Sequence, residues 1–508
     1  MPKYYLLAEA FNLNHMVYDT HDISTIRGGS FLLLNAIKRL QKNFENRLKP
    51  ISTAASTGLF VYEDAGNLDA QRAGIAQEVL RVLHDDTGGY ATFLVAIEKD
   101  IPENFQLVLA RLEAEVRRQQ WRMPTVVVPD FDATDQECYL DGWRPGVEPY
   151  TLDPMFKISK ATYYRRERGR ELKHTLFQEL FGEESDGADL CAKDLGELAN
   201  DSSKGILNGK IAFIHIDGNS FGSIREKKCI DPITRENFDA TIQKYREDFL
   251  DDLRKAAYKD PDFHFQLKNG IDVLRLEVLL WGGDECTIVV PAWKGLEVLE
   301  RFYRKTADLK FGGVQMTHRA VVIFCHHDAP ILQVRMLAER MLEIAKKNIK
   351  NQFEAAFGSD PALSSLADED RTQQQKLLSN AKYCNAARYL VLESFDMLRG
   401  SLEQFLERYY GDTSMGNILL HASIMSEIRV NMRTICERVP KSRVINLASA
   451  ISRNDIASKE ELRNKLNESI EPEQRDVALA AIDAFTKENN AGWFILADLW
   501  DYAQEWKA

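Results

Sequence analysis

Hydrophobic and polar positions alternate between two periods over the first quarter of the chain. Short apolar runs are typical of strands at residues 4–10, 58–64, 91–99 and 124–131. Between them, apolar residues recur with the period of a helix at residues 25–44, 68–84 and 103–120. Strands that alternate with helices in this way predict a sheet with helices packed against it.

A second alternating block follows after residue 208. Its elements, in order, are a strand, a helix, a hairpin, a helix, a strand and a helix, at residues 210–217, 238–255, 273–281 with 286–291, 296–309, 316–327 and 331–347. The order strand, helix, hairpin, helix, strand is the ferredoxin-like plan that polymerase palms share. The first block fits the same plan if residues 50–56 and 58–64 form its hairpin.

The fold class predicted is α/β (α+β), with two ferredoxin-like palm modules and an all-α C-terminal domain. The linking stretch is rich in proline, glycine and charge, and residues 389–396 favour one further strand. Beyond it the pattern is helical almost throughout, including residues 401–410 and 417–439. The expected units are a degenerate first palm, a connector with helices, a catalytic palm and a helical C-terminal domain, at residues 1–131, 132–208, 209–395 and 396–508.

Composition places the chain among globular proteins of a reducing compartment. The sequence has 508 residues, a formal net charge of −12 and seven cysteines without a C-x-x-C pair. Scattered cysteines of this kind do not form a disulfide framework or a zinc motif that the sequence alone reveals. No apolar run approaches the roughly 18 residues of a membrane span, and the N-terminus has no signal-peptide pattern. We therefore expect a soluble, cytoplasmic protein that does not bind membranes.

Carboxylates stand where two predicted strands end. Asp217 closes the apolar run KIAFIHID, and Asp284 and Glu285 lie at the tip of the hairpin VLLWGGDECTIVVP. In a palm the first strand lies next to the hairpin, so these groups should meet at one end of the sheet. Carboxylates on adjacent strands form a site for hard divalent cations such as Mg²⁺ or Mn²⁺. Two such ions, roughly 4 Å apart, activate an attacking hydroxyl and stabilise a leaving pyrophosphate.

Glycines next to these carboxylates favour a phosphate-bearing ligand. Gly218 lets the backbone turn and approach a ligand closely, and Gly282 and Gly283 give the hairpin its backbone freedom and leave room for a triphosphate. Either acidic motif alone is common as a solvated turn. Both motifs together, in this order within one palm pattern, predict a metal and nucleotide site.

Two other features have structural explanations as well as functional ones. The basic clusters at residues 163–174 and 429–443 could contact phosphates, but a solvated helix face is the favoured interpretation. The stretch Arg27-Gly28-Gly29-Ser30 is expected near the interface of the two modules, or else as a turn at the start of a helix.

Several stretches of the sequence resemble one known protein family. The stretches IAFIHIDGNSFG and WGGDE resemble the two catalytic motifs of the large, polymerase-like subunit of type III CRISPR effector complexes. The stretch THRAVVIFCHHDAPILQVRMLAERMLEIAKK is similar to the strand and helix that follow, and DTHDISTIRGGSFLLLNAI resembles the start of the family's non-catalytic first palm. The resemblance covers most of residues 1–395. Cyclases of the GGDEF type are more distant relatives.

The resemblance implies a function and a set of site residues. The family's catalytic palm joins ATP into cyclic oligoadenylates, which act as antiviral messengers, and its first palm helps to hold the second nucleotide. Asp217 and Asp284 would bind the metals, with Glu285 beside them and the Gly218 carbonyl assisting. The nucleotide would contact Gly218, Asn219, Gly282, Gly283 and Lys346, where Lys346 is alternatively a solvated helix-end lysine and Lys347 competes for its role.

The chain also departs from the family pattern. Glu285 stands where the family usually has aspartate, and Asn219 and Ser220 supply no further carboxylate after Asp217. The family's usual four-cysteine zinc feature is absent. The leading hypothesis is a metal-dependent synthase of a cyclic nucleotide or oligonucleotide, with ATP favoured and with RNA, CRISPR-type subunits or a cyclic-nucleotide-activated effector as partners. The alternatives are a catalytically silent palm scaffold and a template-directed polymerase.

Overall fold

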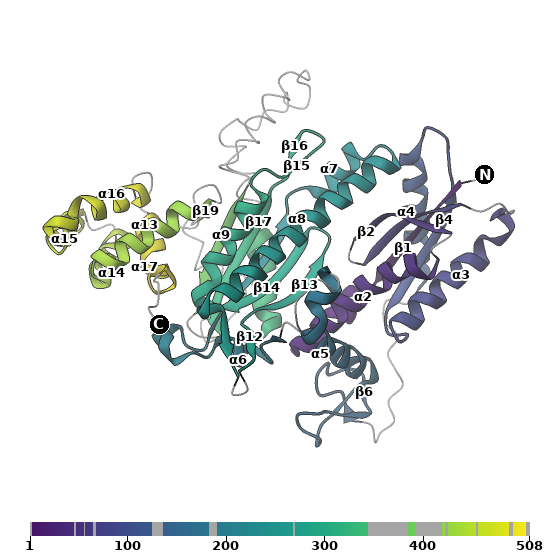
Figure 1. Ribbon diagram of the computed structural model, residues 1–508, viewed down its shortest axis with the longest axis horizontal. Helices are drawn as coiled ribbons and strands as arrows, with labels where there is room; N and C mark the ends of the chain where they lie inside the picture. Colours follow the sequence, from purple (N-terminus) through teal and green to yellow (C-terminus); the bar gives the residue numbers. More distant parts are fainter. Residues whose placement is uncertain are drawn as a thin grey trace.

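The computed structural model describes residues 3–44, 47–54, 56–63, 68–123, 136–181, 190–267, 270–343, 385–392, 419–421, 425–453, 456–486 and 491–503. A four-stranded module, a six-stranded module and a group of C-terminal helices follow one another across the molecule (Figure 1). This arrangement confirms the predicted fold class of two ferredoxin-like modules followed by helices.

The first module has the split β-α-β plan. Its elements are β1 (Lys3–Phe11), α1 (Leu13–Val17), α2 (Ile23–Asn43), β2 (Leu48–Ala54), β3 (Thr57–Glu63), α3 (Leu68–Asp86), β4 (Thr92–Lys99) and α4 (Phe105–Arg122). The antiparallel sheet has the order β2-β3-β1-β4, with β2 and β3 as the predicted hairpin. Alternate residues of β1 enter different cores, because Tyr4 and Leu6 pack with α2 and α3, whereas Tyr5 and Leu7 pack with α4. The strand predicted at residues 124–131 lies outside the described residues.

The connector is built from small hairpins and one long helix. Its elements are β5 (Gln136–Glu137), β6 (Pro145–Gly146), β7 (Glu148–Pro149), β8 (Lys157–Ile158), α5 (Lys160–Phe181), β9 (Leu190–Cys191), α6 (Leu195–Ala199) and the 3-10 helix η1 (Ser202–Leu207). Strands β5 and β6 pair with each other, as do β7 and β8.

The second module repeats the plan of the first. Its elements are β10 (Lys210–Gly218), α7 (Phe221–Lys228), α8 (Pro232–Lys259), η2 (Pro261–Phe263), β11 (His264–Gln266), β12 (Asp272–Leu274), β13 (Glu277–Gly282), β14 (Glu285–Pro291), η3 (Ala292–Lys294), α9 (Gly295–Thr306), β15 (Lys310–Phe311), β16 (Val314–Gln315), β17 (His318–His326), β18 (Ala386–Val391) and β19 (Leu419–His421). The sheet order β13-β14-β10-β17 matches the order β2-β3-β1-β4, and β18 and β19 extend it. A further helix begins at residue 331 and is described to residue 343.

The predicted strand at residues 273–281 is two strands. Strand β12 pairs with β11 and β9, whereas β13 pairs with β14. Between them the buried Arg275 donates hydrogen bonds to the backbone carbonyls of Glu197, Leu198 and Asn200. A charged side chain that is fixed to the end of α6 in this way interrupts the apolar run, so the continuous strand that the pattern predicted does not form.

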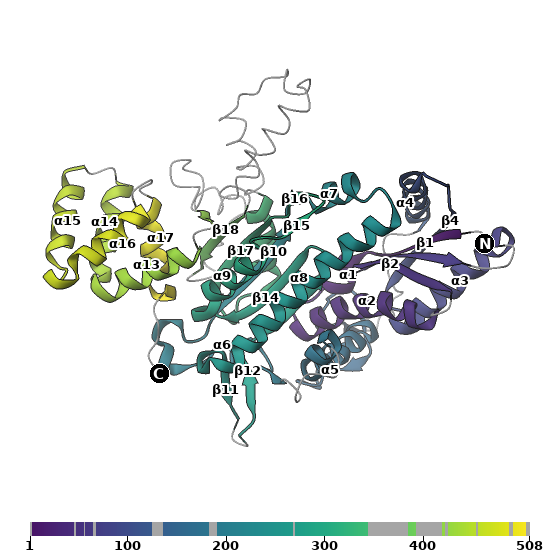
Figure 2. The same ribbon diagram turned by 45° about the horizontal axis from the view of Figure 1, so that its top comes forward.

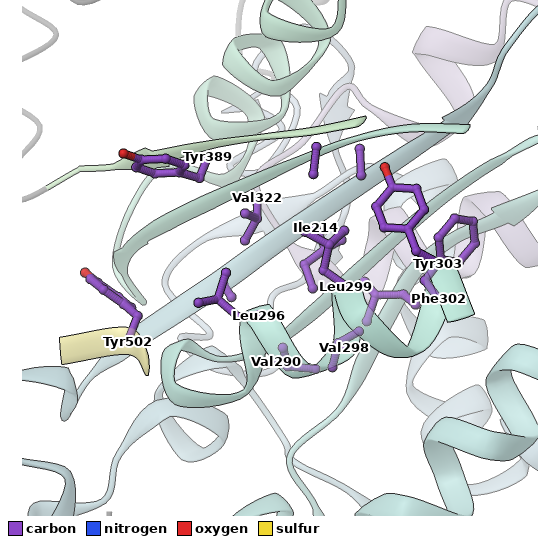
Figure 3. Packing of buried hydrophobic residues seen from close by; sticks show 14 of the residues in the cluster. Ile214, Val290, Leu296, Val298, Leu299, Phe302, Tyr303, Val322, Tyr389 and Tyr502 are labelled. Atoms are coloured by element: carbon purple, nitrogen blue, oxygen red, sulfur yellow. The ribbon is translucent and has the colours of Figure 1, made fainter. Parts of the chain in front are cut away.

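The second sheet is buried on both faces. On β10, Ala212, Ile214 and Ile216 pack with α8, α9 and the C-terminal helices, as Figure 3 shows for the residues around Ile214. Ile211 and Phe213 face the other core, which contains residues of α2 and of the helix over 331–343. The long α8 lies along the sheet in Figure 2, and it begins with a capping box between Asp231 and Thr234. This sequence signal extends the helix beyond its predicted start at residue 238.

Helix α2 joins the two modules. The buried Arg27 forms a bidentate ion pair with the buried Glu277 of β13 and donates to the Gly169 carbonyl at 2.6 Å. A Cβ atom on Gly28 would lie 1.8 Å from the backbone oxygen of Arg165, so only glycine allows α2 and α5 to cross at this distance. The stretch of residues 27–30 therefore lies at the module interface, inside a helix, and does not form a turn at a helix start.

The C-terminal helices pack against the second module. They are α13 (Met425–Arg438), α14 (Lys441–Ser452), α15 (Ile456–Glu468), the 3-10 helix η7 (Pro472–Gln474), α16 (Arg475–Thr486) and α17 (Ala491–Ala503). Trp493 and Trp500 are buried in the same core as β10. The helix predicted at residues 417–439 was wrong at its start, because residues 419–421 pair with β18 as a strand. Residues 401–410 lie outside the described residues.

The favoured interpretation of the basic cluster at residues 163–174 was also wrong for two of its arginines. Arg165 and Arg166 are buried, and they form ion pairs with Asp19 and Asp22 of the first module. These arginines therefore hold α5 against α2 instead of covering a solvated helix face. Among the described helices, none combines the length and the apolar character that crossing a bilayer requires.

Candidate functional site

The two predicted acidic motifs come together where β10 ends and the β13–β14 hairpin turns. In the sheet, Ile216 of β10 lies opposite Cys286 of β14. Two residues further on, the backbone N–H of Gly218 donates to the carbonyl oxygen of Asp284 at 3.2 Å. A Cβ atom on Gly218 would lie 2.8 Å from the Cβ of Asp284, so glycine is required for this close approach.

The hairpin turn itself depends on one glycine. Gly282 pairs with Glu285, which leaves Gly283 and Asp284 as a two-residue loop. Gly283 has a φ of 54°, in the left-handed region that favours glycine, and nothing lies within 4 Å of a Cβ built on it. Gly282 belongs to β13 and has no positive φ. The backbone freedom predicted for both glycines is thus used only at Gly283.

The three carboxyl groups disturb one another electrostatically. The pKa of Asp284 is raised, first because the group is desolvated and then because Asp217 lies nearby. The pKa of Glu285 is raised to about 7, first by desolvation of its carboxyl group, although the residue keeps an exposed surface, and then by Asp217 and Asp284. These raised pKa values mean that the surrounding protein does not fully balance the negative charge of the carboxylates. Such a site favours a cation.

Two arginines, the buried Arg319 and the half-buried Arg246, approach this site from different elements. Arg319 of β17, which lies opposite Asp217 in the sheet, forms an ion pair with it at 3.0 Å. Arg246 of α8 stacks on Trp281, with 4.4 Å between the guanidinium carbon and the ring centroid, and donates to the Gly283 carbonyl at 3.0 Å. Within the described part of the chain, the Nε and Nη2 groups of Arg246 have no hydrogen-bond partner.

A buried polar pair lies next to the carboxylates, two residues further back along β10 and β14. His215 and Thr287 are both buried, and His215 Nδ1 lies 2.9 Å from Thr287 Oγ1. Burial, with a smaller contribution from Arg335, lowers the pKa of His215 to about 4, so the imidazole is neutral at pH 7. Asp217 follows His215 by two residues and Glu285 precedes Thr287 by two, so their side chains emerge on this same face. It is the face toward the first module and the helix over residues 331–343.

The first module reaches the site through Tyr18. The guanidinium of Arg335 lies 3.2 Å from the centroid of the Tyr18 ring and also forms an ion pair with Glu339. The pKa of Tyr18 is raised to about 12, first by burial and then through a balance between Arg335 and the acidic Glu285 and Glu339. Tyr18 is therefore close enough to Glu285 for the two groups to affect each other's charge.

The remaining predicted residues have mixed outcomes. The side-chain amide of Asn219 donates to Thr317 Oγ1 at 3.0 Å, and its backbone N–H donates to the Thr317 carbonyl, so this residue joins the end of β10 to the start of β17. Its predicted contact with a nucleotide stays a prediction. Lys346 and Lys347 lie outside the described residues.

Sequence reasoning missed the arginines. Arg319 interrupts the apolar run THRAVVIFC, and a charged residue within a buried strand is the signal that could have identified it. Arg246 and Arg335 lie on helices among other charged residues, where no local pattern distinguishes them.

No protein-family model matches the chain, and no curated protein matches it. Among solved structures, the chain is similar to Csm1 from T. onnurineus, with 12% identity, a TM-score of 0.49, and coverage of 99% of this chain and 70% of that one. It is similar to the Csm1–Csm4 cassette in complex with pppApApA, with 13% identity, a TM-score of 0.49, and coverage of 99% and 69%.

The chain is also similar to the Csm1–Csm4 cassette in complex with pppApA, with 12% identity and a TM-score of 0.43. This match covers 68% of this chain and 53% of that one, so the chain spans about half the length of that relative. A further similar structure is the Csm1–Csm4 subcomplex of the type III-A CRISPR-Csm interference complex. The structures named here all contain Csm1, and one of them is described as part of a type III-A CRISPR-Csm interference complex.

Proposed function

We propose that the chain is a nucleotidyltransferase that depends on Mg²⁺ or Mn²⁺ and makes a cyclic mono-, di- or oligonucleotide from ATP or another nucleoside triphosphate. The observation that carries this proposal is the meeting of Asp217, Asp284 and Glu285 at two adjacent strand ends, with the pKa of Asp284 and Glu285 raised. Uncompensated carboxylates cost stability unless a cation binds them.

The donor set fits a hard divalent cation. Carboxylate oxygens of Asp217, Asp284 and Glu285, with the backbone carbonyl of Gly218, are the ligand types that Mg²⁺ and Mn²⁺ prefer. Bound cations of this kind neutralise phosphate charge and lower the pKa of an attacking hydroxyl group. The space around Gly283 is free of described side chains, since nothing lies within 4 Å of a Cβ built on this residue.

The reaction is the attack of a 3′-hydroxyl group on the α-phosphorus of a nucleoside triphosphate. A new P–O bond forms, the bond to the pyrophosphate group breaks, pyrophosphate leaves with its electron pair, and the hydroxyl proton passes to solvent. Such a reaction needs mainly positioning and neutralisation of charge. The carboxylates would supply both by holding the cations at a defined place on the sheet, where the positive charge would neutralise the phosphates, so no further catalytic side chain is required.

The test is incubation of the purified protein with each nucleoside triphosphate and Mg²⁺ or Mn²⁺, followed by mass spectrometry. An Asp284→Ala/Glu285→Ala protein and a protein with the exposed Glu236 changed to alanine serve as the inactive and matched controls. We expect a product without a free triphosphate from the wild type and from Glu236→Ala, and none from the double variant. A product that persists in the double variant would refute the site assignment.

One contact favours a second candidate, a catalytically silent palm that acts as a scaffold for RNA or protein. Asp217 already has an ion-pair partner in Arg319 at 3.0 Å, and this arginine competes with any cation for the carboxylate. The scaffold predicts that no nucleoside triphosphate is converted and that Mn²⁺ binds no more tightly to the wild type than to the double variant. Metal-dependent nucleotide binding without turnover would instead indicate a synthase that needs an activating partner.

The wider role follows from the resemblance of the two motifs. It implies a cyclic oligoadenylate messenger in antiviral defence, made in the cytoplasm and received by a cyclic-nucleotide-activated effector. CRISPR-type subunits or RNA are the proposed activating partners. ATP is therefore the first substrate to test.

A further inference from the structure

A cluster in the connector has the sequence spacing of a four-ligand zinc site. Cys138 and Asp141 are separated by two residues, as are Ser159 and Thr162, and residues 142–158 lie between the pairs. Zinc sites of the form C-x2-C…C-x2-C place roughly 15–20 residues between their two pairs. The first member of each pair lies next to one of the small hairpins β5–β6 and β7–β8.

All four side chains converge on one buried point. Cys138, Ser159 and Thr162 are at most 3% exposed, and the Asp141 side chain is fully buried. The backbone N–H groups of Asp141 and Ser159 donate to Cys138 Sγ at 3.5 and 3.2 Å. Backbone N–H groups that point at a cysteine sulfur after a tight turn are what a metal-binding knuckle needs. In this chain they surround a single cysteine.

Direct hydrogen bonds join the four side chains where a zinc site would have its ion. Thr162 Oγ1 donates to Asp141 Oδ2 at 2.8 Å, Ser159 Oγ lies 3.0 Å from the same oxygen and 2.9 Å from Thr162 Oγ1, and Cys138 Sγ lies 3.9 Å from Thr162 Oγ1. Zinc with Zn–O bonds of about 2.0 Å in tetrahedral geometry holds its oxygen ligands roughly 3.3 Å apart. The oxygens of the cluster are closer together, at the distances of direct hydrogen bonds.

The charges around the cluster disfavour a divalent cation. Arg144 forms an ion pair with Asp141 at 3.0 Å, and Arg165 Nη2 donates to Thr162 Oγ1 at 3.3 Å. Burial acts to raise the pKa of Asp141, but hydrogen bonds from the Arg144 backbone and from Thr162 outweigh it and lower the pKa to about 2. The one carboxylate is thus ionised and already neutralised by arginine, and the hydroxyl groups are poor zinc ligands.

We infer that Cys138, Asp141, Ser159 and Thr162 form a metal-independent counterpart of a two-knuckle zinc site, in which hydrogen bonds hold the two hairpins together. This differs from the four-cysteine zinc feature that is usual in the family that the sequence resembles, and it stands independently of the proposed function.

The cluster stabilises the segment of the first module that lies next to the candidate site. Ser159 caps α5 by accepting the backbone N–H of Thr162 at 3.1 Å. From the first turns of this helix, Arg165 donates to Asp19 at 2.7 and 3.0 Å and to the Met16 carbonyl at 2.7 Å. Asp19 directly follows Tyr18, whose ring lies under Arg335 beside Glu285. The cluster therefore fixes the segment through which the first module reaches the carboxylates.

The first test compares the full-length wild type with Asp141→Cys/Ser159→Cys/Thr162→Cys, each purified with and without zinc. We expect no stoichiometric metal in the wild type by elemental analysis, and a melting temperature that a chelator does not change. The triple variant, with four cysteines at this cluster, should bind one zinc ion per chain, show thiolate charge-transfer absorption with cobalt, and melt at a lower temperature when a chelator is present. A wild type that carries stoichiometric metal, or a folded triple variant that binds none, would overturn the inference.

A second variant keeps the inference testable if the triple variant does not fold. Thr162→Val removes only the hydroxyl group, and Thr241→Val is its control, because the Thr241 hydroxyl makes an exposed helix-surface bond to the Asn237 carbonyl. We expect Thr162→Val to melt at a lower temperature than both the control and the wild type, with no effect of zinc. Identical melting of the two valine variants would overturn the inference.

Discussion

Removing the charge of Glu285 should stabilise the protein when divalent cations are absent, by an amount that grows as the pH rises above about 4.5 and levels off above about 7. The pKa of Glu285 is raised from 4.5 to about 7 because its carboxyl group is desolvated and lies beside Asp217 and Asp284. In the unfolded chain the same group loses its proton near 4.5. The folded protein therefore binds more protons than the unfolded protein between these two values, and its free energy of unfolding falls as the pH rises through this window.

The size of the effect follows from the shift and from solvent access. At about 1.36 kcal/mol per pKa unit the whole shift corresponds to roughly 3 kcal/mol. Glu285 keeps an exposed surface, so screening by solvent reduces this figure, and we expect Glu285→Gln to gain about 1 kcal/mol at about pH 8. No gain is expected at about pH 4.5, where Glu285 of the wild type is protonated in the folded state.

The assay is thermal unfolding of chelator-treated protein across this pH range. Wild type, Glu285→Gln and the exposed-surface control Glu236→Gln are compared, and the series is repeated with Mn²⁺. The advantage of Glu285→Gln should grow with pH and should shrink when Mn²⁺ is present, because the cation offsets the repulsion in the wild type. A gain that does not depend on pH, or a loss of stability at about pH 8, would refute the electrostatic account of the site.

Three further predictions concern packing. Gly218→Ala should weaken Mn²⁺ binding, measured by electron paramagnetic resonance, with little change in circular dichroism, because its Cβ would lie 2.8 Å from the Cβ of Asp284; unchanged binding would contradict the close approach of the two turns. Gly28→Ala should lower the melting temperature strongly, since its Cβ would lie 1.8 Å from a backbone oxygen of α5, whereas Gly74→Ala on α3 has open space and should stabilise by up to about 1 kcal/mol. Glu277→Ala leaves the buried Arg27 without its carboxylate partner, so the free energy of unfolding in urea should fall by about 3–5 kcal/mol. A fall below about 1 kcal/mol would exclude this ion pair as the contact that holds the two modules together.

Local periodicity was sufficient for most strands and helices of both modules and for the strand ends that carry the acidic motifs. The apolar run KIAFIHID identified β10 and placed Asp217 at its end, and the apolar runs on either side of Gly-Gly-Asp-Glu identified the hairpin. The pattern failed at Arg275, where a buried guanidinium divides an apolar run between two sheets. It also failed at residues 419–421, where pairing with β18 outweighs a helical pattern.

The neighbours of the site could not be predicted, because they come from elements far apart in the sequence. Arg246 lies on α8, Arg335 on the helix after β17, and Tyr18 in the first module, and each arrives at the carboxylates only through packing. The same holds for the cluster of the connector. An aspartate, a serine and a threonine are not recognisable in the sequence as neighbours, and their side chains meet only when the two hairpins fold together.

The sequence by itself determined most of the strands and helices, their order, and which strand ends carry carboxylates, because the period of the apolar residues shows which face of a strand or helix is buried. Only the tertiary structure decided what surrounds those carboxylates and how the two modules are fastened. The buried pair of Arg27 and Glu277, the crossing of α2 and α5 at Gly28, and the hydrogen-bonded cluster all depend on contacts between residues distant in the chain. Such contacts follow from strand register and helix crossing, which no local pattern encodes.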